Sequence, residues 1–422
     1  MAIVAGCRTP FARAGTVYRD LTAVDLGALA LRELLARTEL DPRSVDSVVM
    51  GQVIPSVKAM NLAREVTLRT ALPRSVPAYT VNRACASSGQ AIVAVASEIL
   101  LGQAEVGIAG GAESLSDLPI LHSAGMARAI LGLSKARSLG ARLSLLAKLR
   151  PRDLVPQTPA IAEPSTGLTM GQSAEKMAKE NGITRREQDE IALASHRRAA
   201  AAAEEGRFAG ETCTVLVPPR YETVVSSDNL IRKDTSLEAL QALPPVFDRR
   251  QGTVTAGNSS PLTDGAAVLL LMSEERAQAE GLEPLAFVRS WAVSAVDPAG
   301  QLLMGPALAI PLVLERAGLT LADMEILEMH EAFAAQVASN IQALESESWA
   351  REMLGRSSAV GRVDRERLNV NGGSIAIGHP FGATGARIAT TLAHEMRRRN
   401  LGLGLLSICA QGGMGLAMVL ER

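Results

Sequence analysis

Two segments far apart along the chain share a pattern of small apolar residues that is typical of a fully buried helix. Residues 87–101 and 383–394 are rich in Ala, Gly, Ile and Thr and carry few charged side chains. A helix that is apolar on nearly all sides must be buried between other layers of structure. We therefore expect two central helices that pack against each other.

The pattern around these helices also recurs. Each helix is followed by a β-rich run, at 106–111 and at 403–413, and the stretches 31–50 and 312–329 both predict a helix, a polar turn and a strand. Duplication of a βαβ-type unit accounts for both repeats. The predicted fold class is therefore α/β, with two similar halves, each a sheet covered by helices on both faces.

A long polar insert separates the two predicted halves. We expect an N-terminal half made of residues 1–115 plus 246–275, a loop domain at 116–245 and a C-terminal half at 276–422. Residues 118–152 contain seven Lys or Arg and no acidic residue, and 131–149 follow an amphipathic basic pattern. Four prolines predict a loop at 151–164, and 172–205 predicts polar helices broken at Gly182.

Composition and charge exclude several classes of protein. The chain has 422 residues, 47% hydrophobic and 21% charged, with a formal net charge of −1, which is typical of a globular protein. This balance argues against a disordered chain and against a nucleic-acid-binding protein, which usually carries a basic excess. No apolar run reaches the ~18 residues of a membrane span. The N-terminal segment lacks the pattern of a signal peptide, so we expect a cytoplasmic protein.

The cysteines are candidates for single reactive thiols. Cys7, Cys85, Cys213 and Cys409 form neither a disulfide framework nor the close pairs of a zinc site, so no metal is expected. Cys85 directly precedes the first buried helix, where the helix dipole lowers a thiol pKa and backbone N–H groups can face an oxyanion. Cys409 ends the last strand before a Gly-rich turn. From position alone, a nucleophile and a buried core cysteine are equally consistent with each site.

Two histidines are candidates for proton transfer. His379 lies between Gly378 and Pro380, in a turn just ahead of the second buried helix, and His330 follows a strand and is expected to begin a helix. Either histidine alone is more often structural. However, the duplication places Cys85 and His379 ahead of equivalent helices, and a base held beside a thiol can activate it. We therefore expect Cys85, His379, His330 and Cys409 to share one pocket.

These motifs together resemble the thiolase family. The resemblance rests on the flank of Cys85, on His330 to Phe333, on Gly378 to Pro380 and on Cys409 with its Gly-rich tail, and it covers essentially the whole chain. Most thiolases have Asn where this chain has His330. That histidine, together with the basic insert and residues 165–171, is similar to the β subunit, a 3-ketoacyl-CoA thiolase, of the trifunctional fatty-acid oxidation complex.

The resemblance implies a thiolase fold and cleavage of 3-ketoacyl-CoA by CoA in fatty-acid β-oxidation. Cys85 would form an acyl-enzyme after His379 accepts its proton, and Cys409 would move the second proton. His379 and His330 would hold the thioester oxygen of the enolate, while backbone N–H groups of Cys85 and Gln411 would hold the acyl oxyanion. Coenzyme A would be a co-substrate, with no tightly bound cofactor.

The resemblance also implies contacts with substrate and partners. Ser260, Met170 and Phe333 would line the pantetheine tunnel. A homodimer or larger oligomer and a hydratase/dehydrogenase α subunit are the implied protein partners. The basic insert has four open interpretations: contact with CoA phosphates, contact with a membrane surface, docking of a partner subunit, or a solvated face.

Three alternative functions remain at this point. A biosynthetic acetoacetyl-CoA thiolase, an acetyl-CoA acetyltransferase, shares the motifs, although His330 and the basic insert argue against it. A ketoacyl synthase shares a Cys-centred duplicated fold but usually lacks a second catalytic cysteine such as Cys409. A non-catalytic lipid-binding or scaffold subunit would not need four intact reactive side chains.

Overall fold

The computed structural model describes residues 1–156 and 162–422, which form two compact units. The large unit contains Met1–Pro55, Ala59–Asp117 and Ala162–Arg422, and the small unit contains Ser56–Lys58 and the described part of Leu118–Ile161. The predicted proline-rich loop at 151–164 lies partly outside the described residues. The domain boundaries expected at residues 115, 245 and 275 stay a prediction.

The first half of the large unit follows the predicted alternation of strands and helices. Its elements, with η denoting a short 3-10 helix, are β1 (Ala2–Arg8), β2 (Ala12–Arg13), α1 (Ala23–Thr38), η1 (Pro42–Ser44), β3 (Ser47–Gly51), α2 (Leu62–Leu68), β4 (Ala78–Val81), α3 (Ser87–Leu100), β5 (Val106–Glu113) and β8 (Thr263–Met272). Every residue of β5 and β8 is buried, as expected for strands covered on both faces.

The second half repeats this plan. Its elements are α9 (Glu274–Ala279), β9 (Ala286–Ala295), η3 (Leu302–Met304), α10 (Gly305–Ala317), η4 (Leu321–Asp323), β10 (Ile326–Met329), α11 (Ala334–Glu345), α12 (Glu347–Leu354), α13 (Ser374–Ile377), α14 (Thr384–Arg399), β11 (Leu403–Ala410) and β12 (Met414–Glu421).

Strand order and direction are the same in the two halves. The first half contains the order β3-β5-β8-β1 and the second half the order β10-β11-β12-β9. In each half the first two of these strands are parallel and the later neighbours are antiparallel. The halves join where β1 pairs with β9, with Ala2 opposite Phe287 and Ile3 opposite Ala286. The predicted duplication and fold class are thereby confirmed.

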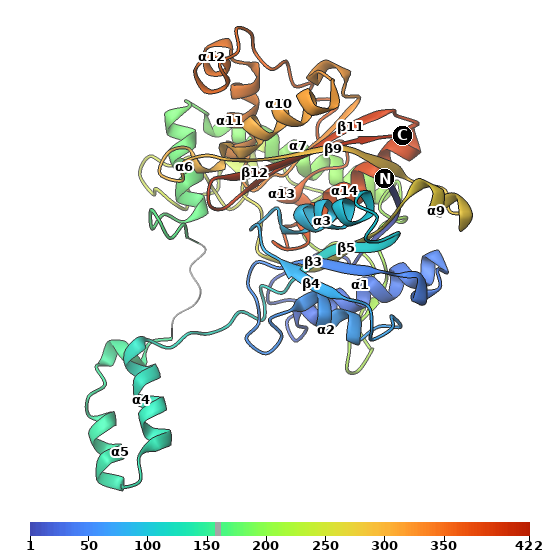
Figure 1. Ribbon diagram of the computed structural model, residues 1–422. Helices are drawn as coiled ribbons and strands as arrows, with labels where there is room; N and C mark the ends of the chain where they lie inside the picture. Colours follow the sequence, from blue (N-terminus) through green and yellow to red (C-terminus); the bar gives the residue numbers. More distant parts are fainter. Residues whose placement is uncertain (157–161) are drawn as a thin grey trace. The chain divides into compact units, whose positions relative to one another are not determined.

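The two buried helices lie at the centre of the large unit. Figure 1 shows α1 and α2 below the strands of the first half, α3 and α14 between the two groups of strands, and α10 and α11 above the second group. Helices α3 and α14 contact each other at glycines. A Cβ atom added at Gly385 would lie 2.4 Å from the backbone nitrogen of Gly89. This close packing brings the N-terminal ends of both helices to one place.

The segment between the halves divides between the two units. In the large unit it forms α6 (Met170–Glu180), α7 (Arg185–Glu204), β6 (Val215–Leu216), β7 (Val224–Val225) and α8 (Leu237–Gln241). Gly182, with a φ of 66°, separates α6 from α7, which confirms the predicted break.

The described part of the small unit consists of two short α-helices and one 3-10 helix. It contains α4 (Ala124–Lys135), α5 (Leu139–Leu146) and η2 (Pro151–Leu154). The basic pattern at 131–149 is therefore interrupted where α4 ends at Lys135. Leu131, Leu139, Leu143 and Leu146 are exposed. Among the described residues of the chain, no helix is both long and apolar enough to cross a membrane.

Candidate active site

Cys85 lies in a tight turn between β4 and α3. Ala84 has a φ of 45°, and the Ser87 hydroxyl donates to the Ala84 carbonyl (2.6 Å) and accepts from the Arg83 N–H (2.8 Å). This turn holds the partly buried thiol ahead of the helix. Burial raises the pKa of Cys85 to about 12, although the backbone N–H groups of Gln411 and of Cys85 itself act in the opposite direction.

His379 faces the Cys85 thiol. Its Nε2 atom lies 3.3 Å from Sγ of Cys85, and its Nδ1 atom lies 2.6 Å from Oγ1 of Thr384. The Thr384 hydroxyl donates to the Pro380 carbonyl (3.0 Å), so Nδ1–H donates to Thr384 and Nε2 keeps a free lone pair. Burial lowers the pKa of His379 to about 3, so the imidazole is a neutral base directed at the thiol.

His330 packs against His379. Their ring centroids are 4.2 Å apart, and Nδ1 of His330 lies 2.9 Å from Oγ of Ser374, which also accepts from Nη2 of Arg387 (2.8 Å). Burial, then the nearby His379 and Arg387, hold the pKa of His330 well below its usual range. The expectation that His330 begins a helix is wrong, because α11 starts only at Ala334. The turn between His330 and α11 carries Glu331, whose carboxylate is buried in a hydrogen-bond network.

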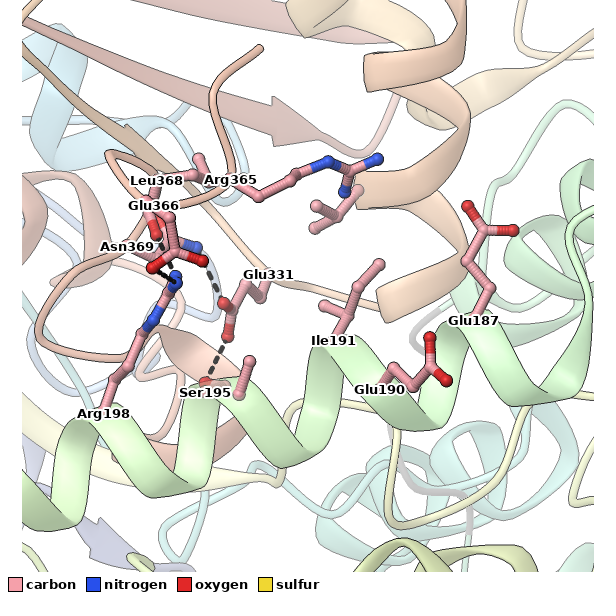
Figure 2. A pocket seen from close by; sticks show the side chains of 12 residues that line it. Glu187, Glu190, Ile191, Ser195, Arg198, Glu331, Arg365, Glu366, Leu368 and Asn369 are labelled. Carbon is pink, nitrogen blue, oxygen red and sulfur yellow. Dashed lines mark hydrogen bonds and ion pairs between the residues drawn. The ribbon is translucent and has the colours of Figure 1, made fainter.

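Glu331 anchors the loop that carries His330. Its carboxylate accepts from Ser195 Oγ (2.7 Å), from Asn369 Nδ2 (2.7 Å) and from the Ile375 N–H (3.2 Å). Figure 2 shows Glu331 directed toward Ser195 of α7 and toward Asn369. These residues line a pocket of about 330 Å³. The carboxylate therefore ties the His330 loop to α7 and to the segment that holds Ser374.

Cys409 is the second thiol near Cys85. It is buried as the penultimate residue of β11, which is not the last strand as expected, because the chain turns back at the glycines to form β12. Burial, together with the neighbouring Cys85, raises the pKa of Cys409 well above its usual range. The following turn has positive φ only at Gly412 and Gly413. Gln411 therefore needs no strained backbone, and its Nε2 donates to the Ala162 carbonyl (2.8 Å).

Two of the three residues expected to contact CoA pack against the apolar cluster that contains Cys409. Met170 and Phe333 belong to the same apolar cluster as Cys409, and the Phe333 ring packs edge-on against Phe247 at a centroid distance of 6.2 Å. The Ser260 N–H donates to the Ala332 carbonyl (3.0 Å), and Ser260 lines a pocket of about 390 Å³. These positions are compatible with the expected CoA contacts, which stay predictions.

The residues that position the histidines were missed by sequence reasoning. Thr384, Ser374 and Arg387 hold the imidazoles, yet Ser and Thr are common throughout the chain and Arg387 lies within an apolar helix. A buried arginine in such a helix was the one available signal, since buried charge is rare without a partner.

The arrangement supplies the parts of acyl transfer through a covalent intermediate. A thiol faces a neutral base, a second thiol lies nearby, and backbone N–H groups are directed at the Cys85 sulfur. Comparison with known families agrees: the family described as "Thiolase, N-terminal domain" matches residues 1–275, and "Thiolase, C-terminal domain" matches 282–422.

The chain belongs to the thiolase family. It is 54% identical to a 3-ketoacyl-CoA thiolase of Pectobacterium carotovorum and 52% identical to one of Serratia proteamaculans, each match covering 100% of this chain and 96% of the relative.

Solved thiolase structures share the fold over the whole chain. The acetyl-CoA acetyltransferase of Bacillus anthracis superposes with a TM-score of 0.85 at 36% identity, covering 100% of this chain and 98% of the other. Human mitochondrial 3-ketoacyl-CoA thiolase in complex with CoA gives a TM-score of 0.83 at 35% identity, covering 100% and 97%.

Proposed function

We propose that this thiolase is an acyltransferase that cleaves 3-ketoacyl-CoA with CoA, giving acetyl-CoA and a shortened acyl-CoA in fatty-acid β-oxidation. The observation that carries the proposal is the 3.3 Å contact between His379 Nε2 and Cys85 Sγ, with a second thiol, Cys409, near the first. The full-length relatives named 3-ketoacyl-CoA thiolase support this substrate class.

In the first half-reaction, Cys85 becomes acylated. Its proton passes to His379 Nε2 as sulfur attacks the 3-keto carbon, and collapse of the tetrahedral adduct breaks the bond between C2 and C3. The leaving group is the enolate of acetyl-CoA, which takes a proton from Cys409. A neutral thiol and a neutral imidazole suit this step because no charge has to be held in the resting site.

In the second half-reaction, CoA removes the acyl group. The Cys409 thiolate takes the proton of the CoA thiol, whose sulfur attacks the thioester on Cys85. Cys85 leaves as a thiolate and recovers its proton from His379, so the site returns to its starting state. Two thiols are needed because the nucleophile is occupied while another proton moves.

Two separate sets of donors would stabilise the oxyanions. His379 and His330 are proposed to face the thioester oxygen of the enolate, since their rings are adjacent. The N–H groups of Cys85 and Gln411 are proposed to face the acyl oxyanion, because both already lie toward the sulfur. Each such donor is typically worth about 2.7–4 kcal/mol in the transition state.

The proposal extends to the partners of the enzyme and to its location in the cell. CoA and 3-ketoacyl-CoA are the proposed small-molecule partners, with a homodimer or larger oligomer in the cytoplasm. The exposed leucines and basic residues of α4 and α5 support the use of the small unit for an α subunit or for peripheral contact with a membrane.

The decisive experiment is an assay of CoA-dependent loss of 3-ketoacyl-CoA across a series of chain lengths. We expect cleavage of long chains by the wild type, none by Cys85→Ala, and an acyl group trapped on Cys85 in Cys409→Ala by mass spectrometry. The second candidate, an acetyl-CoA acetyltransferase, is favoured by the structural neighbour of that name. Activity confined to acetoacetyl-CoA would select it instead.

A further inference from the structure

Three potential metal ligands meet in the active site. One ligand atom each from Cys85, His330 and His379 lie within 4.8 Å of one another. The close pairs of cysteines or histidines that mark a zinc site in a sequence are absent here, because Cys85 is 294 residues from His379. The tertiary structure alone brings the three side chains together.

One buried ring nitrogen of this cluster lacks a hydrogen-bond partner and points to a missing ligand. Nε2 of His330 is fully buried and has no hydrogen-bond partner among residues 1–156 and 162–422. A buried polar atom normally has a partner, and leaving it without one costs about 1–3 kcal/mol. Nε2 of His379 faces the Cys85 thiol, its hydrogen-bond partner at 3.3 Å.

The other ring nitrogens are held as they are in metal-binding histidines. Nδ1 of His379 contacts the Thr384 hydroxyl, and Nδ1 of His330 contacts the Ser374 hydroxyl. Such a contact fixes the ring orientation and leaves Nε2 for a metal. In a tetrahedral site, Zn–S of 2.3 Å and Zn–N of 2.0–2.1 Å place sulfur and nitrogen roughly 3.6 Å apart. The observed 3.3 Å between Cys85 Sγ and His379 Nε2 needs only a small adjustment.

We propose that Cys85, His330 and His379 form a binding site for a thiophilic divalent cation, represented by Zn²⁺, which inhibits the enzyme by capping its nucleophile. The ion binds Sγ of Cys85 and Nε2 of both histidines, with its fourth position open to water. Binding forms the Zn–S bond and releases the Cys85 proton to solvent. No oxidation is involved, so removal of the ion by a chelator restores the free thiol.

His330 makes this site possible in this chain. A Cys/His pair alone offers two ligands, whereas His330 supplies a third nitrogen of the kind zinc prefers. Asn at this position would offer a weak oxygen or a non-ligating amide nitrogen instead. Susceptibility to zinc should therefore depend on residue 330 more than on the rest of the fold.

The test measures Zn²⁺ binding to the full-length enzyme without CoA, by competition with a chromophoric chelator. We expect one ion per chain in the wild type, a loss of affinity on the order of 100-fold in His330→Asn and Cys85→Ser, and a loss of about tenfold in Ser374→Ala. Zn²⁺ should also slow the alkylation of Cys85 by iodoacetamide, followed by mass spectrometry. Neither readout requires turnover, so failure of the proposed reaction would not affect them.

Matched controls come from side chains outside the cluster. His196→Asn and Cys213→Ser change a buried histidine and a buried cysteine elsewhere in the large unit and should keep full affinity. Circular dichroism verifies that each variant is folded, and the alkylation experiment on the wild type needs no variant. Absence of stoichiometric binding, unchanged affinity in His330→Asn, or loss of binding in Cys213→Ser would overturn the proposal.

Discussion

The Nε2 atom of His379 lies 3.3 Å from Sγ of Cys85, although the two residues are 294 positions apart. Each residue sits just ahead of one of the two central helices, α3 and α14. The contact therefore depends on how closely those helices pack and on how firmly the imidazole is oriented. Both conditions can be tested separately.

Thr384 orients the imidazole, so Thr384→Val should impair catalysis. The change removes the 2.6 Å contact with His379 Nδ1. Without this contact, nothing favours the imidazole tautomer in which Nδ1 carries the proton and Nε2 is the base. We expect kcat/KM for thiolytic cleavage to fall on the order of 10- to 100-fold. Thr390→Val is the matched control. The Thr390 hydroxyl donates to the carbonyl four residues earlier, as the Thr384 hydroxyl does, but Thr390 does not hydrogen-bond His379. Equal losses in both variants would contradict a positioning role.

The glycine contact sets the distance between the helices, so Gly385→Ala should separate thiol and base. The added Cβ would meet the Gly89 backbone nitrogen at 2.4 Å, and backbone atoms cannot move aside as a flexible side chain can. We expect a loss of about 1–3 kcal/mol in the free energy of unfolding and reduced activity in the folded fraction.

Gly140→Ala is the control for this change. Gly140 lies in α5 with nothing within 4 Å of an added Cβ, so alanine there should be neutral or slightly stabilising. Urea denaturation followed by circular dichroism measures both variants. Wild-type stability in Gly385→Ala would mean that the helices can separate without cost.

The pKa shifts predict how Cys85 reacts with pH. Burial raises the pKa of Cys85 to about 12 and lowers that of His379 to about 3, so the resting pair is a thiol and a neutral imidazole. Below its pKa, the thiolate fraction rises tenfold per pH unit. Alkylation of Cys85 by iodoacetamide should therefore accelerate steadily from roughly pH 6 to pH 10. A plateau near neutral pH would reveal a thiolate–imidazolium pair instead.

Buried neutral histidines predict a loss of stability in acid. Burial lowers the pKa of His196 to about 4, below its ordinary value. A histidine with a depressed pKa stabilises the fold above its unfolded pKa, and this contribution is lost as the pH falls, because only the unfolded chain takes up the proton. Between pH 7 and pH 5 the wild type should lose about 2 kcal/mol more than His196→Asn. If urea denaturation shows that the free energy of unfolding falls equally with pH in the wild type and in His196→Asn, the lowered pKa of His196 is contradicted.

Local pattern predicted the buried helices and the repetition of the two halves, but neither the break within residues 131–149 nor the start of α11. The small apolar residues of α3 and α14 predict buried helices, and the recurring order of helices and strands predicts two similar halves, because burial between layers restricts composition. The motifs around Cys85, His330, His379 and Cys409 likewise predicted side chains that the structure brings together, and their reactivity stays a prediction.

Tertiary structure decided how those side chains are held and what else they can bind. Ser374 and Glu331 acquire their roles from contacts with residues 44 and 136 positions away, whereas Thr384 and Arg387 act over 5 and 13 positions through the local course of the chain. Nε2 of His330, which has no partner among the described residues, has no counterpart in any local pattern. The reason is physical: hydrophobic periodicity reports which face of an element is buried, whereas a hydrogen bond depends on sub-ångström placement that the whole packed chain determines.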